Sequence, residues 1–167
     1  MAEFYLKASF AFQCSNAELA LLNEAFQAAT DISIGFDPGQ PSAAFLAVFP
    51  PFEHADPWSG LRSIFPDPQF PTFGADISAD TTSEAPDVWA VHIFGMDDFQ
   101  PEPISNLIHH CCQATLGAGP IGFAWAETCS KPRVNEFGGG WCAIFRDRIE
   151  FETSREALAT ALAEGIL

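Results

Sequence analysis

Basic residues are scarce in this chain. Seven Lys and Arg residues stand against 22 Asp and Glu residues, and the formal net charge at pH 7 is -15. Because so acidic a chain repels phosphate backbones, ordinary binding to DNA or RNA is disfavoured. The cations are also unevenly placed, since five of the seven lie in residues 131–167. This distribution indicates either a soluble surface with a few ion pairs, or an acidic face for a basic partner together with a local anion site.

Long apolar runs are also lacking. The longest, Ala43–Phe49, is too short to cross a bilayer and is followed by Pro50 and Pro51. The N-terminus lacks the basic start and apolar block of a signal peptide, so we expect a cytoplasmic protein without membrane contact. The five cysteines are odd in number and irregular in spacing, which favours buried, reduced thiols over disulfides or a zinc ribbon.

Local catalytic motifs are the third absence. Ser15 and Ser59 have no G-x-S-x-G setting, and the sequence contains no Walker loop, dinucleotide fingerprint or H-E-x-x-H pattern. The enzyme classes that these motifs mark are therefore excluded, and a non-catalytic protein without a cofactor is favoured. Enzymes that carry no such motif stay open.

Periodicity predicts the elements of the first part of the chain. Apolar residues alternate over 4–12, which predicts a half-buried strand. Ser15 and Glu18 form a capping-box pattern before an amphipathic helix over 16–30. Further along, we predict strands over 32–36 and 43–49 and a short helix from Asp56-Pro57 to Phe65. Residues 66–87 are rich in proline and acids and predict a linker or long loop.

The second part repeats this order. We predict a strand over 88–94, a helix over 101–115, a strand over 121–126 and a hairpin from strands 141–145 and 148–152. Thr153 and Glu156 form a second capping-box pattern. The last helix, which ends at Gly165, is expected to bury four apolar residues, Ala157, Leu158, Ala161 and Leu162.

Two pairs of segments are similar in letters as well as in order. QAATDISIGF at 27–36 matches QATLGAGPIGF at 113–123, and AFLAVF at 44–49 matches GWCAIF at 140–145. We therefore predict one compact α+β domain over 1–167, built by internal duplication. Two degenerate β-α-β-β-α halves, 1–65 and 88–167, would share a mostly antiparallel sheet with helices packed on it. This element order resembles the tandem strand-helix-strand-strand modules of gyrase-inhibitor-like ligand-binding proteins, and that resemblance implies a ligand groove between the halves.

Histidines and acids outside the 129–141 segment have structural interpretations. The HHCC run at 109–112 cannot converge on one metal ion, because consecutive helical residues point about 100° apart. His92 lies mid-strand and is a weak catalytic candidate; if its face is buried, it is a hydrogen-bonded core histidine. Asp97 and Asp98 precede a helix, which favours a capping role over acid–base chemistry.

The segment CSKPRVNEFGGGW, from Cys129 to Trp141, has three interpretations. Glycines before a strand usually form a bulge or make room for a neighbouring backbone. The favoured interpretation of the segment is therefore a structural connector between two strands. A second interpretation is an anion site. It would combine the cations of Lys131 and Arg133 with the backbone N–H groups of Gly138, Gly139 and Gly140, beside Trp141. Cations near Cys129 would favour its thiolate, which makes it a candidate nucleophile.

Three function classes follow. The first is a non-catalytic acidic binding protein, inhibitor-like or immunity-like, that acts on a basic partner. The alternative is a binder of a small anionic ligand in an aromatic-lined groove between the halves, with Trp89, Trp125 or Trp141 in it. The third is an enzyme that uses Cys129 or His92. The chain is expected to be a monomer or a homodimer.

Overall fold

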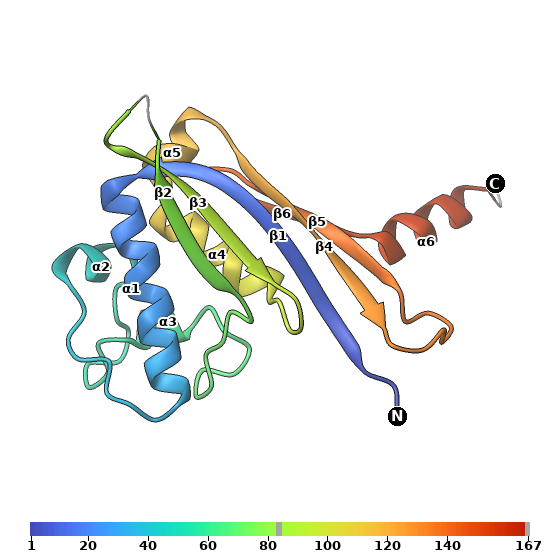
Figure 1. Ribbon diagram of the computed structural model, residues 1–167, viewed down its shortest axis with the longest axis horizontal. Helices are drawn as coiled ribbons and strands as arrows, with labels where there is room; N and C mark the ends of the chain where they lie inside the picture. Colours follow the sequence, from blue (N-terminus) through green and yellow to red (C-terminus); the bar gives the residue numbers. More distant parts are fainter. Residues whose placement is uncertain (83–84, 166–167) are drawn as a thin grey trace.

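A computed structural model describes residues 1–82 and 85–165 of the chain. In those residues, one antiparallel sheet of six strands has the order β2-β3-β1-β4-β5-β6 (Figure 1). The strands are β1 (Phe4–Ser15), β2 (Asp76–Thr81), β3 (Val88–Gly95), β4 (Ile121–Cys129), β5 (Gly138–Ile144) and β6 (Ile149–Thr153). The helices are α1 (Asn16–Ser33), α2 (Ala43–Val48), α3 (Ser59–Arg62), α4 (Pro101–Cys111), α5 (Gln113–Ala118) and α6 (Ser154–Glu164).

Strand β1 is the centre of this sheet. Its residues Ala8–Ser15 pair with β3, and its residues Phe4–Lys7 pair with β4. The order β2-β3-β1-β4, with α1 after β1 and α4 after β3, is the connectivity of the split β-α-β motif. The hairpin of β5 and β6 then widens the sheet beyond β4, and α6 follows at its edge.

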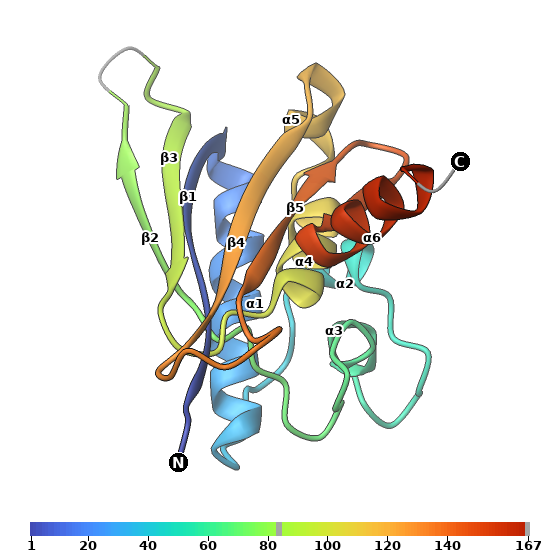
Figure 2. The same ribbon diagram turned by 90° about the vertical axis from the view of Figure 1, so that its right-hand side faces the viewer.

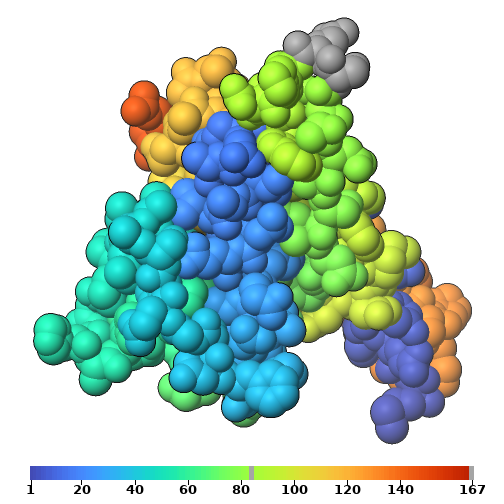
Figure 3. Space-filling model, turned by 60° about the vertical axis from the view of Figure 1, so that its left-hand side comes forward, coloured from blue at the N-terminus to red at the C-terminus, as the bar shows by residue number. Residues whose placement is uncertain are grey.

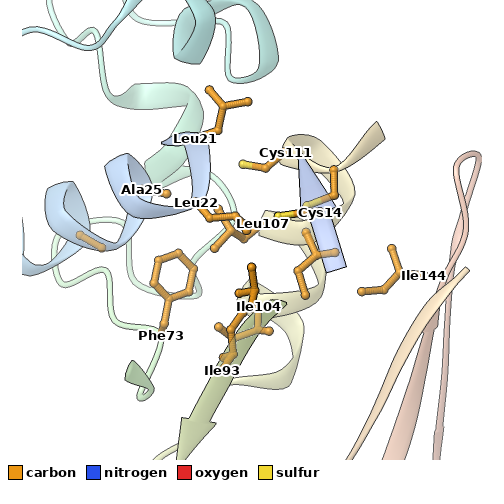
Figure 4. Packing of buried hydrophobic residues seen from close by; sticks show 14 of the residues in the cluster. Cys14, Leu21, Leu22, Ala25, Phe73, Ile93, Ile104, Leu107, Cys111 and Ile144 are labelled. Carbon is orange, nitrogen blue, oxygen red and sulfur yellow. The ribbon is translucent and has the colours of Figure 1, made fainter. Parts of the chain in front are cut away.

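Helices α1 and α4 cover one face of the sheet and contact each other there (Figures 1 and 2). The core lies between these helices and the sheet, and it includes Leu22, Ile93, Ile104, Leu107 and Ile144, all fully buried (Figure 4). On the side of the molecule in Figure 3, α1 lies between the segment that carries α2 and strand β2. The other face of the sheet, here called the open face, exposes alternate residues such as Ser9, Ala11, His92 and Ala124.

The carboxylate of Glu18 joins two helix N-termini. It accepts hydrogen bonds from the Ser15 backbone N–H at 3.0 Å and from the Thr115 N–H at 3.1 Å and hydroxyl at 2.6 Å. Glu18 is only 5% exposed, so these donors replace the water that it loses on folding. The predicted capping box of α1 is confirmed, and the same side chain also fixes α5 to the start of α1.

The prediction of an α+β fold with helices on an antiparallel sheet is confirmed. The strands predicted over 88–94, 121–126, 141–145 and 148–152 are present, as is the capping box of Thr153 and Glu156. The helix predicted over 101–115 is divided at Cys112 into α4 and α5. The helix predicted from Asp56 is shorter and begins later, because Asp56 accepts from the Trp58 N–H in the preceding turn.

Two predicted strands are wrong. Residues 32–36 form the end of α1 and a turn, and Ala43–Val48 is the helix α2. The Ser42 side chain caps α2 by accepting from the Phe45 N–H, and Phe45 stacks on Phe49 one turn later with ring centroids 5.1 Å apart. A short apolar run has no period that separates a buried helix from a buried strand.

An internal duplication is not shown. The similar segments lie in different elements, since 44–49 is mostly α2 whereas 140–145 is mostly β5. Residues 27–36 end α1, but 113–123 contain α5 and the start of β4. Strand β2 lies within 66–87, where the sequence predicted a linker.

The predicted burial of α6 is also wrong. Its residues are exposed from Ser154 to Glu164, with Leu158 at 60% and Leu162 at 63%. The helix leaves the edge strand β6 and extends from the body of the molecule (Figure 1). An apolar stripe predicts a helix but does not say whether a surface of the same chain lies opposite it. Among the described helices, none is long and apolar enough to cross a membrane.

We expect Glu18→Ala to lower the free energy of unfolding by about 1–3 kcal/mol, because it leaves partly buried donors of Ser15 and Thr115 without their acceptor. Burial raises the pKa of Glu18, but the hydrogen bonds from Thr115 and Ser15 outweigh it and hold the pKa below its usual value. The stabilisation is therefore present above the usual carboxyl pKa and is lost as the pH falls through the folded value.

Urea denaturation at pH 7 and at pH 3–5 measures both effects, and Glu18→Gln should flatten the pH dependence. Glu156→Gln is the matched control, because Glu156 has the same capping-box role on the exposed helix α6. Equal losses in Glu18→Gln and Glu156→Gln would contradict the special role of Glu18.

Candidate functional site

A groove opens where the sheet continues past the start of α4. The strand register places Leu6, Trp125, Glu127 and Phe151 on the same face as the core, because Leu6 is opposite Glu127 and Phe151 is opposite the buried Cys142. The first turn of α4 supplies Pro101 and Glu102, and the start of α6 supplies Thr153 and Glu156. The groove has a volume of about 440 Å³.

A second pocket of about 300 Å³ adjoins this groove. The two share Leu6 and Glu127, and the second is also lined by Asp97, Asp98 and Arg155. Nearby, the Glu3 N–H donates to Ser130 Oγ at 2.9 Å, so the start of β1 and the loop after β4 extend together from the body (Figure 3). We call the groove and this pocket together the acidic groove.

Negative charge dominates the acidic groove. Six carboxylates line it, those of Asp97, Asp98, Glu102, Glu127, Glu136 and Glu156, with one guanidinium, that of Arg155. Arg155 Nη2 lies 3.4 Å from Glu127 Oε2 and also donates to the Asn135 carbonyl. Among the described ion pairs, the pair of Arg155 with Glu127 is the one that involves a groove carboxylate. The site therefore keeps a large excess of negative charge.

The three consecutive glycines make room for β4. A Cβ on Gly140 would lie 2.5 Å from the Trp125 ring and 2.6 Å from the Glu152 carbonyl oxygen. A Cβ on Gly139 would lie 2.3 Å from the Trp125 carbonyl oxygen. The Gly139 N–H donates to Ser154 Oγ at 3.1 Å, and Gly138 is paired with Glu127. The run thus allows the Trp125 indole to lie against β5.

The other residues of the candidate anion site lie in the loop after β4 and on the open face of the sheet. Lys131 and Arg133 are exposed in the loop after β4, where the Arg133 N–H donates to the Lys131 carbonyl at 2.8 Å. Trp141 is 42% exposed on the open face, opposite Ala124, whereas its neighbour Gly140 faces the groove side. Arg155 lies close to the glycine run, since its Nε would be 3.9 Å from a Cβ on Gly138.

The two weak catalytic candidates occupy different surroundings. His92 lies on the open face, and its Nε2 is 2.7 Å from Ser9 Oγ. Because the open face is exposed, His92 is not a core histidine. Cys129 is half-buried at the end of β4, opposite Phe4.

The HHCC run points in several directions. His109 Nε2 lies 3.1 Å from the Arg146 carbonyl, whereas His110 stacks on Phe49 with ring centroids 4.5 Å apart. Cys111 and Cys112 are buried. Within the described parts of the chain, no three His, Cys, Asp or Glu side chains are placed to hold a metal ion together.

The sequence predicted Trp125 as a groove residue but missed Phe151, Glu127, Glu102 and Arg155. These residues come from β6, β4, α4 and α6, which only the strand order brings together. One partial signal was available, since the glycines at 138–140 indicate close approach of a neighbouring backbone, and Gly139 and Gly140 do lie against the Trp125 and Glu152 carbonyls.

Comparison with known proteins identifies no relative. No family model, no curated protein and no solved structure matches the chain.

We expect Gly140→Ala to lower the free energy of unfolding by about 1–3 kcal/mol and to alter the near-ultraviolet circular dichroism of Trp125, because the new Cβ overlaps the indole. Gly119→Ala is the control, since a Cβ there meets no atom within 4 Å. Thermal unfolding compares the two variants. A Gly140→Ala protein as stable as Gly119→Ala would show that the glycine is not needed to seat Trp125.

Thiol titration should separate Cys129 from the other cysteines. Cys14, Cys111, Cys112 and Cys142 are buried, and burial raises the pKa of Cys111 and raises that of Cys142 to about 12. An aromatic disulfide reagent should therefore modify one thiol in the native protein and five after unfolding. Cys129→Ser should abolish the native reaction, and a native reaction that persists in this variant would contradict the placement.

Proposed function

We propose that this protein is a non-catalytic binding protein that holds a basic segment of a partner protein in the acidic groove. The observation that carries the proposal is the combination of an apolar, aromatic floor with six carboxylates and one guanidinium. Lys and Arg side chains have apolar stems and charged ends. Their stems match Leu6, Trp125 and Phe151, and their charges match the carboxylates at the rim.

The charge of the whole chain supports the same partner. A net charge of -15 attracts basic proteins over long range and repels acidic ones. The same carboxylates disfavour a small anionic ligand in this groove. A protein that covers the basic surface of its partner also neutralises it, which supports an inhibitor-like or immunity-like role.

The volumes of the groove indicate how much of the partner enters it. About 440 Å³ and 300 Å³ accommodate a few side chains of a polypeptide segment. A whole folded domain would instead contact the rim. We therefore place a segment with closely spaced Lys or Arg residues in the groove and the rest of the partner outside it.

Neutralising the groove should weaken capture of a basic peptide. In the triple variant Asp97→Asn/Asp98→Asn/Glu102→Gln, we expect the Kd for a synthetic peptide with three Lys and Arg residues to rise about tenfold or more at low salt. The reason is that each change removes one carboxylate from the groove while keeping its shape. Isothermal titration calorimetry at several salt concentrations measures the effect.

The matched control is Asp76→Asn/Asp80→Asn/Glu150→Gln, which changes the net charge by the same amount on the open face of the edge strands. The proposal requires the groove variant to lose much more affinity than this control. Equal losses in both variants would show that the peptide responds only to the net charge of the protein.

A further inference from the structure

Two aromatic rings, those of Trp125 and Phe151, line the groove. Trp125 and Phe151 are T-shaped, with ring centroids 6.3 Å apart and ring planes 67° apart. Phe151 is 41% exposed although it faces the groove side of the sheet. Gly140 lies between them in the sheet, and its missing side chain lets the Trp125 indole lie across β5 toward β6.

Carboxylates from three different elements line the same groove as this aromatic pair. Glu102 comes from the first turn of α4, Glu127 from β4 and Glu156 from the first turn of α6. Two of the three are already oriented. Glu156 accepts from the Thr153 N–H at 3.1 Å, and Glu127 contacts Arg155 at 3.4 Å. Side chains held in this way lose little further freedom when a ligand binds.

We propose that Trp125, Phe151, Glu102, Glu127 and Glu156 form a site for the guanidinium of an arginine side chain from the partner. This inference rests on the proposed function and names the residue at the centre of the contact. Aromatic faces attract a cation within about 6 Å of their centroids, and this attraction grows when the site excludes water. Carboxylates at the edge then accept its N–H groups.

The geometry favours arginine over lysine. A guanidinium is planar, stacks on aromatic rings and donates in a fork that matches a carboxylate, whereas an ammonium is compact and strongly hydrated. Glu127 already contacts one guanidinium, that of Arg155, on the side of the adjoining pocket. Arg155 does not line the groove that holds the aromatic pair, so this contact leaves the aromatic pair free for a second guanidinium.

The test uses three short alanine-rich peptides that differ only at their central residue, which is arginine, lysine or citrulline. Citrulline keeps the shape of arginine without its charge. Each peptide is titrated into the full-length, isotope-labelled protein, and the indole N–H signal of Trp125 is followed by nuclear magnetic resonance. We expect the arginine peptide to bind roughly threefold or more tightly than the lysine peptide, and the citrulline peptide to bind weakest.

The variant Phe151→Leu keeps an apolar side chain but removes the π-face. It should raise the Kd for the arginine peptide roughly three- to tenfold and change the Kd for the lysine peptide less. Phe94→Leu is the control, because Phe94 lies on the open face of β3. Glu102→Gln should weaken the two charged peptides and leave the citrulline peptide unaffected.

The possible results separate this inference from the proposed function. If Phe151→Leu binds all peptides like the wild type while the groove triple variant loses them, the arginine site is wrong and the proposed function stands. If no charged peptide binds better than citrulline, both are wrong. Free arginine amide that binds as tightly as the arginine peptide would contradict a polypeptide partner.

Discussion

The backbone pairing of β1 with two different strands determines both the core and the acidic groove. Ala8–Ser15 pair with β3 beneath α1 and α4, and Phe4–Lys7 continue past that cover to pair with β4. Leu6 and its neighbour Glu127 therefore lie on the core face of the sheet where a helix no longer shields it. One long strand thus places a buried core at one end and an accessible groove at the other.

The distribution of polar groups follows from this division. In the covered part, Glu18 is the one buried carboxylate among the described residues, and it is satisfied by donors from Ser15 and Thr115. In the uncovered part, carboxylates from β4, α4 and α6 gather around aromatic side chains, with Arg155 as their one close cation. The buried acid stabilises the fold through its hydrogen bonds, whereas the groove acids remain accessible on the surface.

The sequence predicted those features that local interactions determine. Ser15 with Glu18 and Thr153 with Glu156 marked the starts of α1 and α6, alternation marked β1, and a strand was also predicted over 88–94, where β3 lies. It failed where tertiary packing decides, as in the apolar segment Ala43–Val48, which is a helix. The exposure of α6 and the meeting of Trp125 with Phe151 depend on tertiary arrangement and strand register, which no local pattern specifies.

We propose that the acidic groove is the surface that meets a basic partner. Chemical-shift mapping of the isotope-labelled protein with an arginine-containing basic peptide tests it most directly. The account predicts that the largest changes fall on Leu6, Trp125 and Phe151 and on the first turns of α4 and α6. Changes that fall instead on the open face, around Ser9, His92 and Trp141, would contradict it.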